Sequence, residues 1–142
     1  MAGPVEATPA QWAALWAAVD QLLNEREWVA WVKPQQGPDG VIVMGWPEYS
    51  PAMNATLAAL GGVGAITPAF DWPAWRQLWD DPDGTRMRDG PAADAIRYLT
   101  SVVRGERFGD GTIDAAMGNG SLPMALARLR RWYDHESVDP PG

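Results

Sequence analysis

Nine tryptophans in a chain of 142 residues, together with no cysteine and only one histidine, constrain this fold more than any other feature of the sequence. Indole side chains carry a large apolar area that must be buried in a core or against a partner. The absence of cysteine excludes disulfides, thiolate nucleophiles and thiolate metal sites. His135 lies near the C-terminus, where nothing would hold it as a general base or a zinc ligand. We therefore expect a tryptophan-rich core with neither a metal site nor a cofactor.

The length and composition predict a single soluble domain. Hydrophobic residues make up 46% and charged residues 20% of the chain, which is typical of globular proteins. No apolar run approaches the roughly 18 residues of a membrane span. We expect a flexible N-terminus over residues 1–7, one globular domain over residues 8–133 and a disordered tail over residues 134–142. The N-terminus lacks the basic and apolar segments of a signal peptide, so we expect a cytoplasmic protein.

The charge is acidic overall and unevenly distributed. A net charge of −7 argues against general attraction to nucleic acid or to an anionic membrane surface. Residues 1–75 carry two basic residues against seven acidic ones, a net charge of −5. Residues 97–133 carry six arginines against three acidic residues, a net charge of +3. A protein partner is therefore expected in preference to a nucleic acid or a membrane.

Helix start signals recur along the chain. Thr8-Pro9 and Ser50-Pro51 each combine a capping side chain with a proline at the first helical position, and Asp71 is a third capping candidate. Apolar residues at helical spacing follow each start. With the later periodic segments, these signals predict about six helices, over residues 9–24, 51–60, 72–79, 91–105, 110–117 and 121–133. Residues 80–90 are expected to form an acidic loop.

Two β-prone segments predict a hairpin in the N-terminal third of the chain. Residues 27–33 and 41–46 are rich in tryptophan and valine, and residues 34–40 between them have turn composition. Trp28 and Trp31 have opposite parity and are expected on opposite faces. Because an isolated hairpin is marginal in water, we expect it to pack on or beside the helices. The predicted fold is a mainly helical α+β domain of about five to six helices with one β-hairpin.

Two short motifs suggest ligand sites, but a structural role explains each of them better. Gly61-Gly62-Val63-Gly64 resembles a dinucleotide turn, yet it follows a helix and precedes Pro68, which favours a helix stop. Asp81-Pro82-Asp83-Gly84 lacks the remaining ligands of a calcium loop and is interpreted as a turn.

A third motif is rich in aromatic residues. Asp71 and Trp72 could serve a ligand as an acceptor beside a stacking platform. Alternatively, Asp71 caps a helix whose Trp72, Trp75 and Trp79 form a buried stripe, because these tryptophans share one helical face. The spacing favours the stripe.

An ionic cluster at a predicted helix end carries a similar ambiguity. Arg104 and Arg107 could bind a carboxylate or phosphate, with Glu106 orienting one of them or acting as a base. Alternatively, the arginines bond free helix carbonyls and Glu106 pairs with one of them. We favour the structural role and retain Asp71, Trp72, Arg104, Glu106 and Arg107 as candidate ligand-binding residues.

The second half of the chain resembles a small bacterial and phage-borne family known only as a domain of unknown function. The resemblance covers chiefly residues 70–129, and its pattern comprises Phe70-Asp71-Trp72-Pro73-Ala74-Trp75, Leu99, Arg104, Glu106, Arg107, Phe108, Gly111, Ile113, Ala116, Gly120, Leu122, Leu126, Arg128 and Leu129. The family has no assigned activity, so the resemblance implies no catalytic residue.

These observations support one leading functional hypothesis and two alternatives. The leading hypothesis is a non-enzymatic module that binds another protein through Trp28, Trp31 and Trp46 of the hairpin. The first alternative is a ligand-binding or enzymatic domain that uses the candidate ligand-binding residues on a small polar or anionic substrate. The second is an acidic inhibitor that mimics nucleic acid, although the basic second half of the chain fits that hypothesis poorly.

Overall fold

Helix α1 (Pro9–Leu23) begins at the predicted capping box in the computed structural model, which describes residues 6–136. The Gln11 amide nitrogen donates to Thr8 Oγ1 at 3.2 Å, and the Thr8 amide nitrogen donates to Gln11 Oε1 at 2.8 Å. These bonds satisfy two donors that a helix start leaves free. The helical spacing predicts an apolar stripe of Trp12, Leu15, Trp16, Val19, Leu22 and Leu23. All of these are buried except Leu23, which is 49% exposed.

The fold is α+β and mainly helical, as predicted, with seven α-helices and one small hairpin in the described part of the chain. After α1, the elements are β1 (Val29–Val32), β2 (Gln35–Gln36), β3 (Ile42–Val43), β4 (Trp46–Tyr49), α2 (Pro51–Gly62), α3 (Trp72–Leu78), α4 (Thr85–Asp89), α5 (Ala92–Gly105), α6 (Thr112–Gly118), α7 (Ser121–Arg131) and the π-helical turn η2 (Trp132–Glu136). The number of helices exceeds the predicted five to six because α4 lies in the segment expected to be a loop.

Asp81 accounts for this additional helix. Its carboxylate accepts from the amide nitrogens of Arg86 at 2.8 Å and Met87 at 2.9 Å, so one side chain satisfies two donors of the first turn of α4. Met87 is buried and ties the short helix to the core. Propensity alone does not predict a five-residue helix, because its stability comes from the cap and from this tertiary contact.

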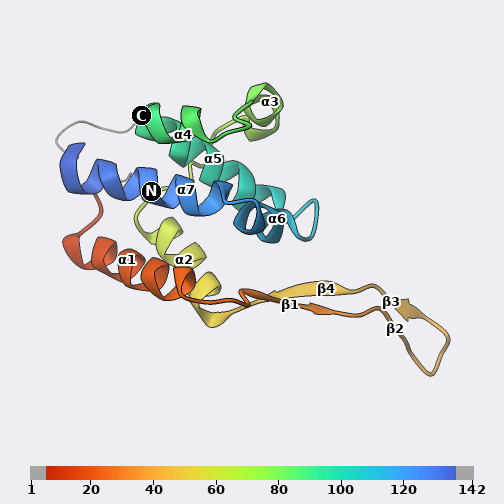
Figure 1. The fold of residues 1–142 in the computed structure, drawn as a ribbon. Helices are drawn as coiled ribbons and strands as arrows, with labels where there is room; N and C mark the ends of the chain where they lie inside the picture. The colour runs from red at the N-terminus through yellow and green to blue at the C-terminus, as the bar shows by residue number, and fades with distance from the viewer. Residues whose placement is uncertain (1–5, 137–142) are drawn as a thin grey trace.

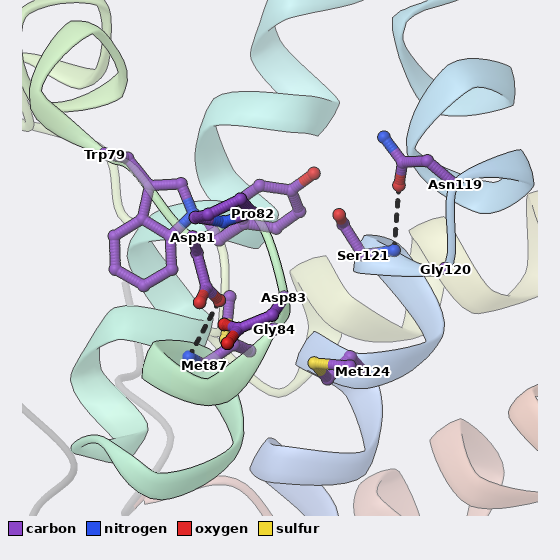
Figure 2. Close-up of a pocket in the computed structure, with 11 residues that line it drawn as sticks. Trp79, Asp81, Pro82, Asp83, Gly84, Met87, Asn119, Gly120, Ser121 and Met124 are labelled. Carbon is purple, nitrogen blue, oxygen red and sulfur yellow. Dashed lines mark hydrogen bonds between the residues drawn. The ribbon is translucent and has the colours of Figure 1, made fainter.

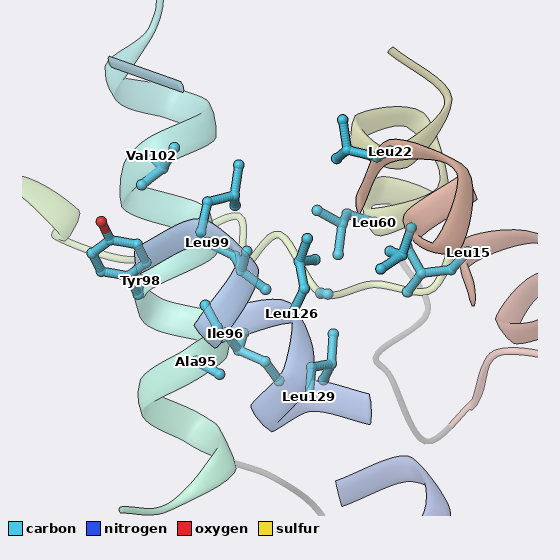
Figure 3. Close-up of a cluster of buried hydrophobic side chains, with 14 of the residues drawn as sticks. Leu15, Leu22, Leu60, Ala95, Ile96, Tyr98, Leu99, Val102, Leu126 and Leu129 are labelled. Atoms are coloured by element: carbon cyan, nitrogen blue, oxygen red, sulfur yellow. The ribbon is translucent and has the colours of Figure 1, made fainter. Parts of the chain in front are cut away.

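The core lies where α7 passes between the α1–α2 pair and α5 (Figure 1). Leu126 and Leu129 of α7 face Leu99 and Ile96 of α5 on one side and the leucines of α1 and α2 on the other (Figure 3). Helix α7 is thereby covered by neighbouring helices on several sides, as expected for a helix at the centre of a bundle. This arrangement leaves α3 and α6 at one end of α5.

An aromatic cluster joins the first helix to the end of the chain. Trp12 stacks on Tyr133 with ring centroids 4.9 Å apart and on Trp16 at 5.6 Å, and Trp132 lies 5.7 Å away at a tilt. Aromatic pairs in these geometries contribute more than their buried area alone. Trp12, Trp16 and Trp132 are therefore core residues.

The described chain remains helical beyond the predicted end of the domain. Residues 134–136 belong to η2, although we expected disorder from Asp134 onward. The Glu136 carboxylate accepts two hydrogen bonds, at 3.1 and 3.0 Å, from the buried guanidinium of Arg128, which also donates to the Gly90 carbonyl at 2.9 Å. A buried arginine requires such partners, and they hold the turn in place. The rest of the expected tail, residues 137–142, and residues 1–5 of the expected flexible N-terminus lie outside the described residues.

The hairpin is formed where the sequence predicts it, but it does not pack along the helices. β1 pairs with β4, β2 pairs with β3, and the hairpin extends away from the helical body with only its base near the helices (Figure 1). The expectation that the hairpin lies on or beside the helices is therefore wrong for its outer half. We call residues 33–45, which include β2 and β3, the outer arm. Within the described residues, no helix has the length and apolar character to cross a membrane.

Candidate functional site

Asp114 at the start of α6 fixes the base of the hairpin. One carboxylate oxygen accepts from Trp28 Nε1 at 2.8 Å, and the other accepts from Trp31 Nε1 at 3.0 Å. The backbone pairing of the hairpin continues to Trp28, whose carbonyl accepts from the Ser50 amide nitrogen at 2.9 Å, yet both indoles reach the same carboxylate. The expected placement of Trp28 and Trp31 on opposite faces is therefore wrong for their indole groups. These two tryptophans anchor the hairpin to the body.

Glu106 organises the loop beside this anchor. Its Oε1 accepts from the Ile113 amide nitrogen and the Tyr49 hydroxyl, and its Oε2 accepts from the Gly111 amide nitrogen, each at 2.8 Å. Burial of Tyr49, together with its hydrogen bond to the Glu106 carboxylate, raises the pKa of the tyrosine hydroxyl well above its usual value. Glu106 is thus engaged in holding the loop 106–113 and the end of β4 together.

Gly111 permits the close contact between the loop and the hairpin. Its φ of +94° lies in the left-handed region, and a Cβ at this position would lie 2.9 Å from two ring carbons of Trp31. Both constraints require glycine here. The base of the hairpin is therefore a packed joint made by Trp28, Trp31 and Tyr49 on one side and residues 106–114 on the other.

The outer arm exposes a continuous apolar row. Val41, Ile42, Val43 and Met44 are all exposed, and Met44 retains 73% of its accessible surface. Trp46, at the base of the outer arm, is 39% exposed, and its indole nitrogen donates to Glu48 at 3.2 Å. Exposed apolar side chains of a folded domain are usually scattered singly over its surface, so four in succession are unusual.

The tryptophans of α3 are half-buried. Trp72 and Trp75 lie on α3 and Trp79 directly follows it, but the helix has no buried residue. The predicted buried stripe is therefore only half covered. Trp75 stacks on Trp79 at 4.9 Å, and the Arg86 guanidinium lies 4.4 Å from the centre of the Trp79 ring.

A groove runs between α3 and the α6–α7 turn, with α5 as its floor. Three connected hollows of about 170, 450 and 290 Å³ form it, and all three are lined by Tyr98 and Asn119. Trp79 stands on one side of the smallest hollow, with Asn119 and Ser121 on the other (Figure 2). The largest hollow, at the other end, is mostly apolar and includes Trp72. Grooves of this size with aromatic walls and a few polar groups are typical of small-ligand sites.

The five predicted ligand-binding residues do not converge on this groove. Trp72 lines the largest hollow, whereas Asp71 caps α3 by accepting from the Ala74 amide nitrogen at 3.2 Å. Glu106 is engaged at the base of the hairpin. Arg104 and Arg107 form no ion pair with any carboxylate of residues 6–136, and neither lines one of the three hollows. The predicted Arg/Glu/Asp cluster is thus not assembled as one site.

Apart from Trp72, the residues that line the groove were not predicted as ligand-binding residues. Arg76 lies on the exposed side of α3, 5.3 Å from the centre of the Tyr98 ring. Tyr98, Asn119 and Ser121 come from α5 and the α6–α7 turn and meet only through tertiary packing. The one available signal in the sequence was the aromatic residue Tyr98, between the apolar helical positions of Ile96 and Leu99. An aromatic residue at such a position occurs in hydrophobic cores as well as in binding sites, so it does not identify a site.

The acidic turn before α4 serves as a cap. Both carboxylate oxygens of Asp81 accept amide hydrogens, and Asp83 accepts from the Thr85 amide nitrogen at 3.1 Å. This bond lowers the pKa of Asp83, with the Thr85 hydroxyl adding to the effect. Among residues 6–136, no three histidine, cysteine or carboxylate side chains are grouped as metal ligands.

Comparison with known proteins assigns the chain to a family without assigning an activity. No curated protein and no solved structure matches the chain. The family described as "Family of unknown function (DUF6508)" matches residues 7–135. This match spans all seven helices and the hairpin, so the hairpin joint and the groove both lie within the family domain. The chain therefore belongs to this family of unknown function.

Proposed function

We propose that this protein is a non-enzymatic interaction module of the cytoplasm whose outer arm inserts into an apolar groove of another protein. The observation that carries the proposal is the row from Val41 to Met44, exposed on a hairpin that extends beyond the helices. A two-stranded hairpin is marginal in water, and its apolar side chains gain free energy when a partner covers them. The anchored base presents this row in a fixed position.

The backbone of the hairpin favours insertion of side chains over pairing with another strand. Pro34 and Pro47 lie on the two sides of the hairpin and lack the amide hydrogens that an added strand would need. The apolar side chains of the tip therefore supply the contact energy.

Charge indicates the kind of partner. Residues 34–46 contain one charged residue, Asp39, whereas the whole chain has a net charge of −7. A tip with a single charged residue in front of an acidic body fits an apolar groove with a basic rim, because the rim would attract the body while the groove accepts the apolar side chains. A second copy of this chain would bring two acidic bodies together and fits less well.

Site-specific crosslinking tests the proposal. A photoreactive residue at Met44 is expected to give an adduct with one partner in the native host, whereas the same residue at exposed Ala14 on α1 gives none. The purified partner is then titrated with full-length protein. The double variant Ile42→Asp, Met44→Asp should weaken binding by at least about a hundredfold, because interface centres concentrate binding energy.

The matched control is the variant Gln35→Asp, Gln36→Asp, which adds the same charge to the exposed polar strand β2. It should weaken binding by about tenfold or less. Equal loss in both variants, unchanged binding of the Ile42/Met44 variant, adducts only between copies of this chain, or no adduct at position 44 would each refute the proposal.

A further inference from the structure

Tyr98 places a hydroxyl without a hydrogen-bond partner at the floor of the groove. The residue as a whole is only 2% exposed, and the exposed part includes the hydroxyl oxygen, which forms no hydrogen bond within the described residues. The other hydroxyls on this part of α5 are bonded to helix carbonyls, since Thr100 donates to the Ile96 carbonyl at 2.8 Å and Ser101 donates to the Tyr98 carbonyl at 2.7 Å. The Tyr98 hydroxyl is the one of the three that remains open to the groove.

The direction of Tyr98 links this hydroxyl to the groove. Its ring borders the leucine cluster, and its hydroxyl points away from Leu126 and Leu129 (Figure 3). Tyr98 also lines all three hollows. The hydroxyl is therefore available as a donor or an acceptor to a molecule in the groove.

The largest hollow sets the shape of that molecule. It has a volume of about 450 Å³, and Trp72, Val102, Phe108 and Ala115 are among its lining residues. An apolar cavity of about 150 Å³ accommodates benzene, so this hollow has room for two fused rings. Trp72 and Phe108 lie against each other, with ring centroids 6.1 Å apart, and offer one aromatic wall on which a planar body can stack.

The charged residues at the polar end of the groove determine which ligand chemistry fits there. Arg76 lines two of the hollows and forms no ion pair within residues 6–136, so its guanidinium is free to donate. Asp80 and Asp81 lie beside it in one of those hollows. Asp81 already accepts two amide hydrogens, and Asp80 adds a second negative charge to the lining of that hollow. An uncharged acceptor, such as a carbonyl oxygen, fits this end of the groove better than an anion, which Asp80 would repel.

We propose that the groove between α3 and the α6–α7 turn binds a small, planar, uncharged aromatic molecule whose carbonyl edge bonds Tyr98 and Arg76. The aromatic body occupies the apolar hollow beside Trp72. The site is separate from the outer arm, so it stands independently of the interaction proposed above.

Three related probes test this site in the full-length protein by calorimetric titration and by the indole NMR signals of Trp72 and Trp79. The probes are 2-naphthamide, which has a neutral carbonyl edge, 2-naphthoate, which is charged, and naphthalene, which has no polar edge. We expect 2-naphthamide to bind most tightly and to shift both indole signals. Tighter binding of 2-naphthoate would overturn the assignment of an uncharged ligand, and equal binding of naphthalene would overturn the polar contact.

Variants locate the binding. Tyr98→Phe should weaken 2-naphthamide about three- to tenfold without lowering thermal stability, because the hydroxyl has no structural partner. Ala115→Phe, at an exposed position that lines the hollow, should abolish binding. Tyr133→Phe removes the same atom from the cluster around Trp12 and should change nothing. Unchanged affinity in both Tyr98→Phe and Ala115→Phe would refute the site, and the Ile42/Met44 variant of the arm should bind the probe normally.

Discussion

Two carboxylates, Asp114 and Glu106, decide how the hairpin meets the helices. Each binds groups from the hairpin and lies in the segment from the end of α5 to the start of α6. Hydrogen bonds to a charged acceptor are roughly twice as strong as neutral ones. The joint therefore depends on a few polar bonds supported by aromatic packing. We expect substitution of its residues to destabilise the hairpin more than substitution elsewhere in the hairpin.

Removing the Asp114 carboxylate should loosen the joint. Asp114→Ala leaves the indole nitrogens of Trp28 and Trp31 without their acceptor, and we expect a loss of about 1–3 kcal/mol in the free energy of unfolding. Urea denaturation measures this loss, and faster hydrogen exchange of the hairpin amides locates it. Asp110→Ala, in the loop before α6, removes an exposed carboxylate without a hydrogen bond, and its free energy of unfolding should stay within about 0.5 kcal/mol of that of the unchanged protein. Equal losses in the two variants would contradict the role of Asp114.

Tyr49 should make stability fall in alkaline solution. Its pKa is raised in the folded protein, so the folded state holds its proton more tightly than the unfolded chain does. The stabilisation is complete below the unfolded pKa of about 10 and is lost as the pH rises above that value. Denaturation at a series of pH values from about 9 to 12 should show this decline. The Tyr49→Phe variant should be less stable at neutral pH, but its free energy of unfolding should change less across the alkaline range. The Tyr133→Phe variant should retain the decline of the unchanged protein.

At the scale of elements, the sequence predicts whether a segment is helical or extended better than it predicts where that segment lies. The capping box at Thr8 and the stripe of α1 are local features, and both are confirmed, except that Leu23 at the end of the stripe is exposed. α4 escaped prediction because Asp81 caps it from outside the helix and Met87 holds it through the core. The hairpin was predicted from its own residues, but its projection depends on Asp114, more than 80 residues away.

The outer arm should be removable without unfolding the body. Replacing residues 33–45 with Asn-Gly joins Val32 to Trp46, which are paired in the hairpin, through a favoured two-residue turn. Because β2 and β3 pair with each other and the exposed side chains of the tip form no core, we expect the free energy of unfolding to change by less than about 1 kcal/mol. Chemical denaturation measures this change, and a loss of several kcal/mol would show that the outer arm supports the body. The shortened protein should also lose its protein partner and still bind 2-naphthamide.

At the scale of the whole molecule, the hairpin and the groove are two separate surfaces, which the sequence did not distinguish. The predicted site joined Asp71 and Trp72 to the cluster around Arg104, although Asp71 caps a helix and Glu106 holds the joint. The sequence could not show whether these charged residues form a binding site. A carboxylate that accepts backbone amide hydrogens and a carboxylate that binds a ligand occur in the same local sequence pattern. The exposure of Trp46 followed from the apolar composition of both hairpin faces, whereas the groove arises only when α3, α5 and α6 come together.

The joint at Asp114 also has a consequence during synthesis of the chain. Trp28 and Asp114 are 86 residues apart, an interval that a ribosome covers in about 4 to 17 s at roughly 5–20 residues per second. Contacts between such distant residues form only after the intervening chain is available. The apolar row of the outer arm therefore emerges well before the residue that holds its base, so we expect a partner or a chaperone to meet the arm while it is still free to turn.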